Sequence, residues 1–382
     1  MIPYGKHSIN EGDIDAVVDV LKSDFLTQGP CVPKFEQVFC EYVNAQYAVA
    51  VNSATSALHI ACLALGVKQG DVVWTTPISF VASANCALYC GARVDFVDVD
   101  SCTANMSPIA LQQKITDTLS LGGALPKVLV VVHMAGNPCD MHAISEITSQ
   151  HDIKVIEDAS HAVGASFEGE PVGHGRYSDI TVFSFHPVKI ITSGEGGMAV
   201  TNCQELHEKM VGLSSHGVTK DPAKMVNNHG DWYYEQQELG FNYRLTDIQA
   251  ALGLSQLARA NEFVEQRRII AKHYQKALAS LSIKLPLVAE SANPSWHLFI
   301  IQLAEGYDRK TIFNQLREMG IGVHVHYIPI YKQPYYQQLG FSLTYCEQAE
   351  HYYRHALSIP LYHGMPESEQ SSVIDALHEV LL

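Results

Sequence analysis

Two hydrophobic periods alternate along the first 245 residues of this chain. Short, nearly continuous apolar runs are typical of buried parallel strands, and helical spacing of apolar residues fills the segments between them. The runs that predict strands are 47–51, 71–75, 93–99, 126–133, 153–158, 180–185 and 198–201. The segments that predict helices are 14–23, 33–43, 56–65, 80–89, 108–115 and 143–151. This alternation predicts an α/β fold with a mostly parallel, helix-covered sheet of about seven strands.

The pattern changes at Thr246, where a long helical run begins and continues to about Leu281. Beyond it, the spacing predicts strands at 296–303 and 322–327 and helices at 309–319 and 368–381. A chain of 382 residues exceeds what one core normally fills. We therefore expect a large domain, residues 1–255, and a smaller α+β domain, residues 256–382.

Composition excludes several classes of function. A formal net charge of −15 disfavours nucleic acids and anionic membranes, which bind clustered Lys and Arg. The 9 cysteines form no C-x-x-C pair and no Cys/His cluster at zinc spacing, so we expect reduced thiols and no metal. The start of the chain has no apolar signal core, and no long apolar run occurs, which predicts a cytoplasmic protein without a membrane segment.

The candidate chemistry centres on Lys189, which follows the predicted strand 180–185 and precedes the small-residue run 192–197. A lysine amine in this position can hold an aldehyde cofactor as a Schiff base, although a solvated surface cation is the simpler alternative. Asp158 ends the preceding predicted strand. A carboxylate there would keep the ring nitrogen of pyridoxal phosphate (PLP) protonated, and its alternative role is a cap for a helix at 159–164. Together, the two residues indicate PLP chemistry.

A phosphate site is predicted where the strand 47–51 turns through Asn52-Ser53-Ala54-Thr55 into the helix 56–65. The first turn of a helix has free backbone N–H groups, and the helix dipole favours an anion there.

Six ordered motifs give the chain its resemblance to a known family. They are Leu26-Thr27-Gln28-Gly29, Asn52-Ser53-Ala54-Thr55-Ser56-Ala57-Leu58, Thr76-Pro77-Ile78-Ser79-Phe80-Val81-Ala82, Glu157-Asp158-Ala159-Ser160-His161, the segment 183–197, and Gly240-Phe241-Asn242-Tyr243-Arg244-Leu245. The chain resembles, over essentially its whole length, the PLP-dependent nucleotide-sugar aminotransferases of the DegT/DnrJ/EryC1 family. The resemblance implies a PLP-dependent transferase type I fold, like that of aspartate aminotransferase, and a homodimer whose active sites lie at the subunit boundary.

The resemblance also assigns roles around the cofactor. Lys189 would anchor PLP and move protons, Asp158 would pair with the ring nitrogen, and His161 would lie near the phenolic edge of the ring. Phe80 would stack on the ring.

The phosphate would be held by Ala54 (through its backbone), Thr55, Ser184 and, from the neighbouring subunit, Asn242. The alternatives are a core aromatic for Phe80, a satisfied structural histidine for His161 and a plain strand hydroxyl for Ser184.

For the nucleotide-sugar, the residues nominated are Tyr4, Gln28, Arg244, His326 and Tyr327. The fork of Arg244 suits a diphosphate or carboxylate, but it suits an inter-subunit ion pair equally well. Gln28 would orient the sugar or simply shape the N-terminal loop.

The substrate expected from the resemblance is a UDP-linked sugar. The segment 325–331 and the Asn52–Leu58 turn favour the branch that moves an amino group from L-glutamate to C4 of UDP-2-acetamido-2,6-dideoxy-β-L-arabino-hex-4-ulose, in pseudaminic acid biosynthesis, and releases 2-oxoglutarate. Another UDP-, GDP- or dTDP-linked 4-keto-6-deoxy sugar is the alternative. Two further alternatives are the dehydratase branch, against which Lys189 argues because that branch has histidine there, and a non-catalytic PLP-binding regulator.

Overall fold

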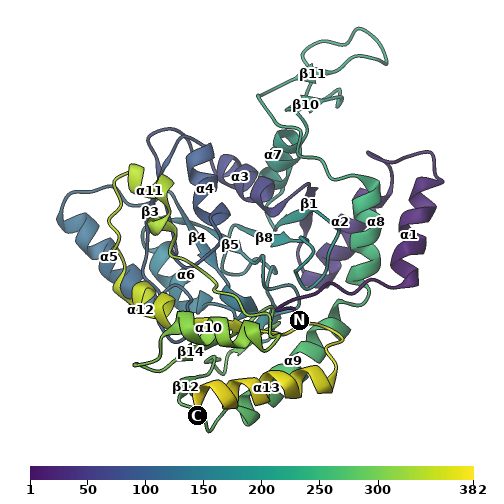
Figure 1. Cartoon of the computed structure of the whole chain (residues 1–382). Coiled ribbons are helices and arrows are strands. Elements are labelled where there is room, and N and C mark those ends of the chain that lie inside the picture. Colours follow the sequence, from purple (N-terminus) through teal and green to yellow (C-terminus); the bar gives the residue numbers. More distant parts are fainter.

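A seven-stranded sheet lies at the centre of the computed structural model, which describes all 382 residues (Figure 1). Its strand order is β1-β9-β8-β5-β4-β2-β3, and only β9 runs antiparallel to its neighbours. The strands are β1 (Tyr47–Val51), β2 (Val72–Thr75), β3 (Arg93–Phe96), β4 (Val128–Val132), β5 (Lys154–Asp158), β8 (Ile180–Ser184) and β9 (Gly197–Thr201). The predicted sheet is therefore confirmed in both its size and its mostly parallel character.

Helices cover both faces of this sheet, which explains the continuous apolar runs in its strands. In β4, Val128 and Val130 pack into one core cluster and Leu129 and Val131 into another. The first face is covered by α3 (Ala54–Ala64), α4 (Ala82–Tyr89) and α7 (Gln204–Ser214). The second face is covered by α2 (Cys31–Val43), α5 (Pro108–Ser120), α6 (Met141–Ser149) and α8 (Asp247–Leu257).

The long helix predicted from Thr246 to about Leu281 is wrong in one respect, because it is two helices. After α8, the chain leaves helical geometry at Arg259 (φ −109°, ψ 4°) and re-enters a helix as α9 (Ala260–Ala277). The Arg259 guanidinium donates to Asp13 at 2.5 Å and to the Ser8 carbonyl at 3.3 Å. Asp13 lies in α1 (Glu11–Leu21), which packs along α8, so contacts with the N-terminal segment accompany the break.

The C-terminal part of the chain forms an α+β unit, as predicted. Its sheet has the antiparallel order β12 (Ile283–Lys284), β14 (Phe299–Leu303) and β15 (Ala356–Ile359). The helices α10 (Arg309–Glu318), α12 (Glu347–His355) and α13 (Glu367–Leu381) accompany it. Figure 1 shows α9, α10 and α13 together at one end of the molecule, where a separate hydrophobic cluster lies. The exact domain boundary between residues 255 and 256 stays a prediction.

The strand predicted at 322–327 is wrong. Around this segment, only isolated bridges form, between Ile321 and Ile2 and between His324 and Ser358. The backbone N–H of Val325 donates to the side chain of His324 at 2.9 Å and not to a neighbouring strand. A side chain that accepts a backbone N–H competes with the hydrogen bonds between neighbouring strands, and this explains why the predicted strand does not form.

The remaining elements are short connections. They are β6 (Ser166–Phe167), β7 (Glu170–Pro171), β10 (Val218–Thr219), β11 (Glu235–Gln236), β13 (Ala292–Asn293), α11 (Pro334–Gln338) and the 3₁₀ turns η1 (Met134–Gly136) and η2 (Ile330–Lys332). The β10–β11 hairpin projects away from the rest of the molecule (Figure 1). None of the helices has both the length and the apolar character that crossing a membrane requires.

Candidate active site

A cavity of about 500 Å³ opens at the carboxyl ends of β5 and β8. These strands are neighbours in the sheet, so residues that end them meet at the same edge. Most of the predicted site residues line this cavity: Tyr4, Ala54, Thr55, Phe80, Asp158, His161, Ser184, Lys189, His326 and Tyr327. The fold thus brings together residues that are more than 300 positions apart in the sequence.

Asp158, the last residue of β5, is fixed by hydroxyl groups. Its side chain is buried, with the residue 4% exposed. Ser83 Oγ of α4 donates to Oδ2 at 2.7 Å, while Ser160 donates to Oδ1 from Oγ at 2.5 Å and from its backbone at 3.1 Å. No α-helix follows at 159–164, so the alternative role of Asp158 as a helix cap does not hold. The carboxylate is therefore held in one orientation beside the cavity.

Lys189 lies in the turn that follows β8. Its backbone N–H donates to the His186 carbonyl at 2.9 Å, and the Thr192 hydroxyl ties the turn to the Phe185 carbonyl at 2.9 Å. Burial lowers the pKa of Lys189 to about 8, against the attraction of Asp158, which raises it. The simpler role of Lys189 as a solvated surface cation is excluded, because the side chain lines the cavity and its pKa is depressed.

The amino end of α3 forms an anion-binding cradle. Ser53 caps the helix by accepting the N–H of Ser56 at 3.1 Å, which leaves the N–H groups of Ala54 and Thr55 facing the cavity end of the helix. Gly197 of β9 allows this approach, because a Cβ there would lie 2.5 Å from the Ala54 nitrogen. Ser184 pairs with Gly197 in the sheet, so its hydroxyl lies beside the same cradle.

His161 differs from a satisfied structural histidine. Its Nδ1 is buried without a hydrogen-bond partner, and its Nε2 lies 3.3 Å from the hydroxyl of Tyr327. Burial lowers the pKa of His161 well below its usual range, and Lys189 and His326 lower it further. The ring is therefore neutral and has a free position for a ligand atom.

The aromatic side chains of Tyr4, His326 and Tyr327 form one wall of the cavity. His326 Nδ1 lies 2.7 Å from the Ser358 hydroxyl, and burial, His324 and Lys189 lower the pKa of His326 to about 3. Burial also raises the pKa of Tyr327 and of Tyr4, whose ring centroid lies 5.4 Å from that of His326. This wall of the cavity is uncharged at neutral pH.

Phe80 stands at the mouth of the cavity. It is 60% exposed, which rules out the alternative of a core aromatic. An exposed ring at this place offers a flat apolar surface to a ligand.

Three predicted residues do not line the cavity in the single chain. Gln28 is exposed in the turn before α2, and Asn242 is exposed with its backbone bridged to Ser215. The Arg244 guanidinium donates to the Ser215 hydroxyl at 3.1 Å. The roles of Gln28, Asn242 and Arg244 stay predictions.

Sequence reasoning missed several residues of the cavity. The lining also includes Ser53, Ser79, Ser160, His186, Glu195 and His324. Ser83, which holds Asp158, was missed as well; it directly follows the motif that contains Phe80, and its hydroxyl lies 2.7 Å from that of Ser79. The signal was present for Ser160, because it stands two positions after Asp158 in the quoted motif.

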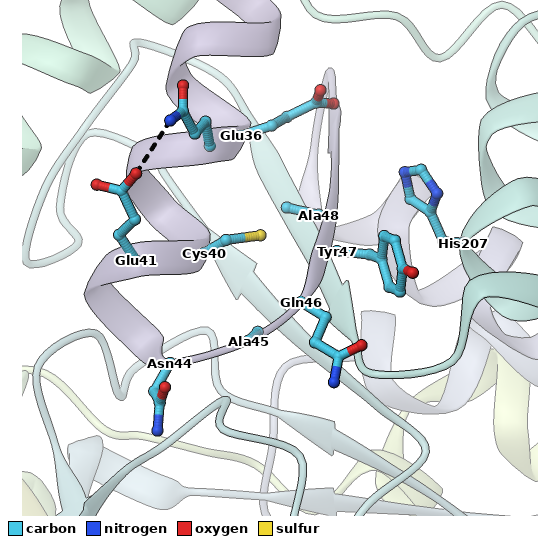
Figure 2. A pocket seen from close by; sticks show the side chains of 10 residues that line it. Glu36, Cys40, Glu41, Asn44, Ala45, Gln46, Tyr47, Ala48 and His207 are labelled. Carbon is cyan, nitrogen blue, oxygen red and sulfur yellow. Dashed lines mark hydrogen bonds between the residues drawn. The ribbon is translucent and has the colours of Figure 1, made fainter.

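A second cavity, of about 540 Å³, lies between α2, the outer edge of β1 and His207 of α7 (Figure 2). Figure 2 shows Glu36 extending from α2 toward the strand, where its carboxylate accepts the N–H of Ala50 at 2.8 Å. Burial raises the pKa of Glu36 to about 7 and that of Cys40 to about 11. None of the predicted site residues lines this second cavity.

Comparison with known proteins decides the family. The pattern of the DegT/DnrJ/EryC1/StrS aminotransferase family matches residues 7–378. This chain belongs to that family. A UDP-4-amino-4,6-dideoxy-N-acetyl-beta-L-altrosamine transaminase of Campylobacter jejuni is 38% identical over 387 residues, which cover 100% of this chain and 98% of the relative.

Solved structures of family members agree with the fold. PseC of Helicobacter pylori, an aminotransferase of pseudoaminic acid biosynthesis, has a TM-score of 0.91 and 32% identity over 100% of this chain and 99% of its own. Spr1654 of Streptococcus pneumoniae, described as a sugar aminotransferase, has a TM-score of 0.91 and 30% identity in its PMP form, over 100% of both chains. The protein is a PLP-dependent nucleotide-sugar aminotransferase with the PLP-dependent transferase type I fold.

The residues of the cavity fit this cofactor. The cradle at α3 suits a phosphate, the oriented Asp158 carboxylate suits a protonated ring nitrogen, and Lys189 supplies an amine of lowered pKa. The unpartnered Nδ1 of His161 leaves a polar atom for the ligand.

Proposed function

We propose that this enzyme moves an amino group from L-glutamate to C4 of UDP-2-acetamido-2,6-dideoxy-β-L-arabino-hex-4-ulose, in pseudaminic acid biosynthesis. The observation that carries the aminotransferase chemistry is the placement of Lys189 and the oriented Asp158 on one cavity. The transaminase of Campylobacter jejuni and PseC of Helicobacter pylori support this sugar, since both match over the full length of the chain.

Proton transfer is assigned to Lys189. When bound, PLP supplies an electron sink that allows the bonds at an amino-bearing carbon to be broken and remade. Lys189 Nζ, whose pKa is lowered to about 8, is neutral in an appreciable fraction of molecules near neutral pH. It would accept the α-proton of glutamate in the first half-reaction and donate a proton to C4 of the sugar in the second. Water would supply the keto oxygen of the departing 2-oxoglutarate, the amino group would stay with the cofactor, and the ketone oxygen of the sugar would leave as water when the sugar takes up that amino group.

Asp158 would keep the cofactor ring cationic. Ser83 and Ser160 each donate to one of its oxygens, which holds the carboxylate fixed while leaving acceptor capacity for the ring nitrogen. Phe80 would stack on the ring, and His161 would meet its phenolic edge.

The phosphate would be held by Thr55, Ser184 and the backbone at Ala54. We assign Asn242 to the same site in a neighbouring subunit of a homodimer, because its exposed side chain lies outside the cavity of its own chain. The same reasoning applies to Gln28 and Arg244 on the sugar side, where the Arg244 fork suits a diphosphate.

The sugar would contact Tyr4, His326 and Tyr327. These side chains are neutral and offer ring faces and hydroxyl groups, which suit a polyhydroxylated ligand. Other UDP-, GDP- or dTDP-linked 4-keto-6-deoxy sugars are the alternative substrates. A non-catalytic regulator is disfavoured, because Asp158, His161, Ser184 and Lys189 all line one cavity and a protein without turnover needs no group to move protons.

The test is mass spectrometry of the products. The holoenzyme is incubated with glutamate and a panel of UDP-, GDP- and dTDP-linked 4-keto-6-deoxy sugars, with the Lys189→Ala variant as control. Amination of the UDP-N-acetyl β-L-arabino ketosugar alone is the expected result. Amination of a different sugar would overturn the proposed substrate while keeping the chemistry, and amination by Lys189→Ala at the normal rate would overturn the role of the lysine.

A further inference from the structure

A cluster of two histidines and one glutamate lies outside the cavity of Lys189. His351 and His355 occupy successive turns of α12, and Glu305 follows β14. Glu305 Oε1 lies 3.6 Å from His351 Nε2 and 3.5 Å from His355 Nε2, and the three atoms all lie within 4.8 Å of one another. We propose that these three side chains bind a divalent transition metal ion of the zinc class.

The donor set suits such an ion. Imidazole nitrogen and carboxylate oxygen are common zinc ligands, and two histidines with one glutamate leave a fourth position for water. Around a tetrahedral zinc at about 2.0–2.1 Å from each ligand, neighbouring ligand atoms lie about 3.3–3.4 Å apart. The distances from Glu305 Oε1 to the two imidazoles are within a few tenths of an ångström of that spacing.

The ring of His355 is oriented so that its outer nitrogen faces the other two side chains. Its Nδ1 lies 2.8 Å from the His351 carbonyl oxygen, and only a protonated nitrogen makes that bond. Its Nε2 faces the Glu305 carboxylate at 3.5 Å. Metal-binding histidines commonly have their second nitrogen bonded to a backbone carbonyl in this way.

The two sides of the site differ in exposure. The side chain of His355 is 10% exposed, that of His351 is 31% exposed, and that of Glu305 is 83% exposed. The two imidazoles therefore come from the more buried side, on one helix, and Glu305 would complete the site from the solvent side. The exposed cations Lys284 and Arg354 act on His351 and reduce the affinity for a cation, but neither occupies a ligand position.

The site would stiffen the support of the active-site wall. Tyr352 of α12 donates to the His326 carbonyl at 3.1 Å, and Ser358 of the following strand bonds the His326 ring. A metal that ties α12 to the turn after β14 would stabilise this support against unfolding without touching the reacting atoms.

The expectation of no metal rested on the absence of a C-x-x-C pair and of a Cys/His cluster at zinc spacing, and the proposed site contains no cysteine. The overlooked signal is the i, i+4 spacing of His351 and His355, which places both rings on one face of a helix. Glu305 cannot be found in this way, because only the fold brings it to the helix.

The test uses the holoenzyme without a histidine tag, first stripped with a chelator and then titrated with Co²⁺. Difference spectra should show the visible bands of tetrahedral cobalt without the charge-transfer absorption of a thiolate ligand, and Zn²⁺ should displace the cobalt. Thermal unfolding should shift upward with metal, because the ion binds the folded state. Glu305→Gln should weaken binding about 10-fold or more, and His351→Gln with His355→Gln should abolish it.

His142→Gln is the matched control. His142 lies 3.4 Å from Glu146 and 3.3 Å from Glu168, but these carboxylates face different ring nitrogens and cannot share one ion with it. Its metal affinity should equal that of the wild type. Equal affinity in Glu305→Gln and the wild type, a thiolate band, or no cobalt spectrum would overturn the site. These readouts are independent of the amination assay.

Discussion

Ser83 Oγ donates a hydrogen bond of 2.7 Å to Asp158 Oδ2, although the two residues are 75 positions apart. Hydrogen bonds to buried charged groups are worth about 1.5–3 kcal/mol. The bond also sets the plane of the carboxylate that we assign to the cofactor nitrogen. Ser83 is therefore a positioning residue, which acts through Asp158.

Replacing Ser83 by alanine should weaken PLP binding about 10-fold and lower kcat, because Asp158 loses its fixed orientation. Ser83→Thr keeps the hydroxyl and should restore part of both. Equilibrium titration of apoenzyme with PLP, followed by cofactor absorbance, measures the effect. Exposed Ser120, which bonds only its own helix, provides the control Ser120→Ala. Unchanged PLP affinity and kcat in Ser83→Ala would contradict the positioning role.

Gly197→Ala should disrupt the phosphate cradle. The added Cβ would lie 2.5 Å from the Ala54 nitrogen, so β9 and the first turn of α3 must move apart. We expect a loss of PLP affinity of at least about 10-fold, since the free N–H groups move away from the phosphate. Gly5→Ala is the control, because nothing lies within 4 Å of its added Cβ. PLP affinity equal in the two variants would show that the cradle does not bind the phosphate.

The lowered pKa of Lys189 should appear in the pH dependence of cofactor capture. Only the neutral amine attacks the aldehyde of PLP, and burial lowers the pKa of Lys189 to about 8. The rate constant for PLP addition to apoenzyme should therefore rise about 10-fold per pH unit below pH 8 and level off above it. Stopped-flow absorbance measures this rate. A rate that continues to rise to pH 10, as for an ordinary lysine, would contradict the burial of this amine.

Glu36 should destabilise the fold above neutral pH. Burial raises its pKa from 4.5 to about 7, so the folded state binds a proton more tightly than the unfolded state. The contribution of Glu36 to the free energy of unfolding is therefore fully present below pH 4.5, where the carboxyl is protonated in both states. It is lost as the pH rises through about 7 and the buried carboxyl ionises. Glu36→Gln keeps an acceptor for the Ala50 N–H, and it should raise the free energy of unfolding by about 1–3 kcal/mol at pH 8 but not at pH 4.

Urea denaturation at the two pH values measures this difference. Glu41→Gln on the same helix is the control, because Glu41 is exposed and should leave the stability unchanged. A variant at Glu36 that is equally stable to the wild type at pH 8 would show that the carboxylate is solvated.

The sequence predicted the reactive pair because parallel strands impose a strong rule. Asp158 ends β5 and Lys189 follows β8, and these strands are neighbours whose carboxyl ends share an edge. Each apolar run marks its strand clearly. Local patterns therefore place both residues at the carboxyl ends of strands, and the pairing of β5 with β8 in the sheet brings them to one cavity.

The hydroxyl groups around Asp158 could not be predicted in the same way. Ser83 is a small residue on a buried helix, and serine there is equally compatible with simple packing. Its role depends on how α4 lies against β5, which no local pattern specifies. For the same reason, the pattern at 322–327 suggested a strand, whereas the His324 side chain captures a backbone N–H that a strand would need.

The residues nominated for the sugar fall into two groups, according to whether they line the cavity of their own chain. Tyr4, His326 and Tyr327 reach the cavity within one chain, whereas Gln28 and Arg244 do not. The contacts that we propose for Gln28 and Arg244 across a second subunit would leave no periodic signal in the sequence and no geometry in a single chain.

The most direct test of the account is the turnover of Lys189→Ala with saturating PLP, glutamate and the UDP-N-acetyl β-L-arabino ketosugar. 2-Oxoglutarate and aminated sugar are quantified together over time, beside the wild type. We predict many turnovers for the wild type and none for the variant, because no other lysine lines the cavity to move the proton. Sustained turnover by Lys189→Ala, without added amine, would contradict the central role of this lysine.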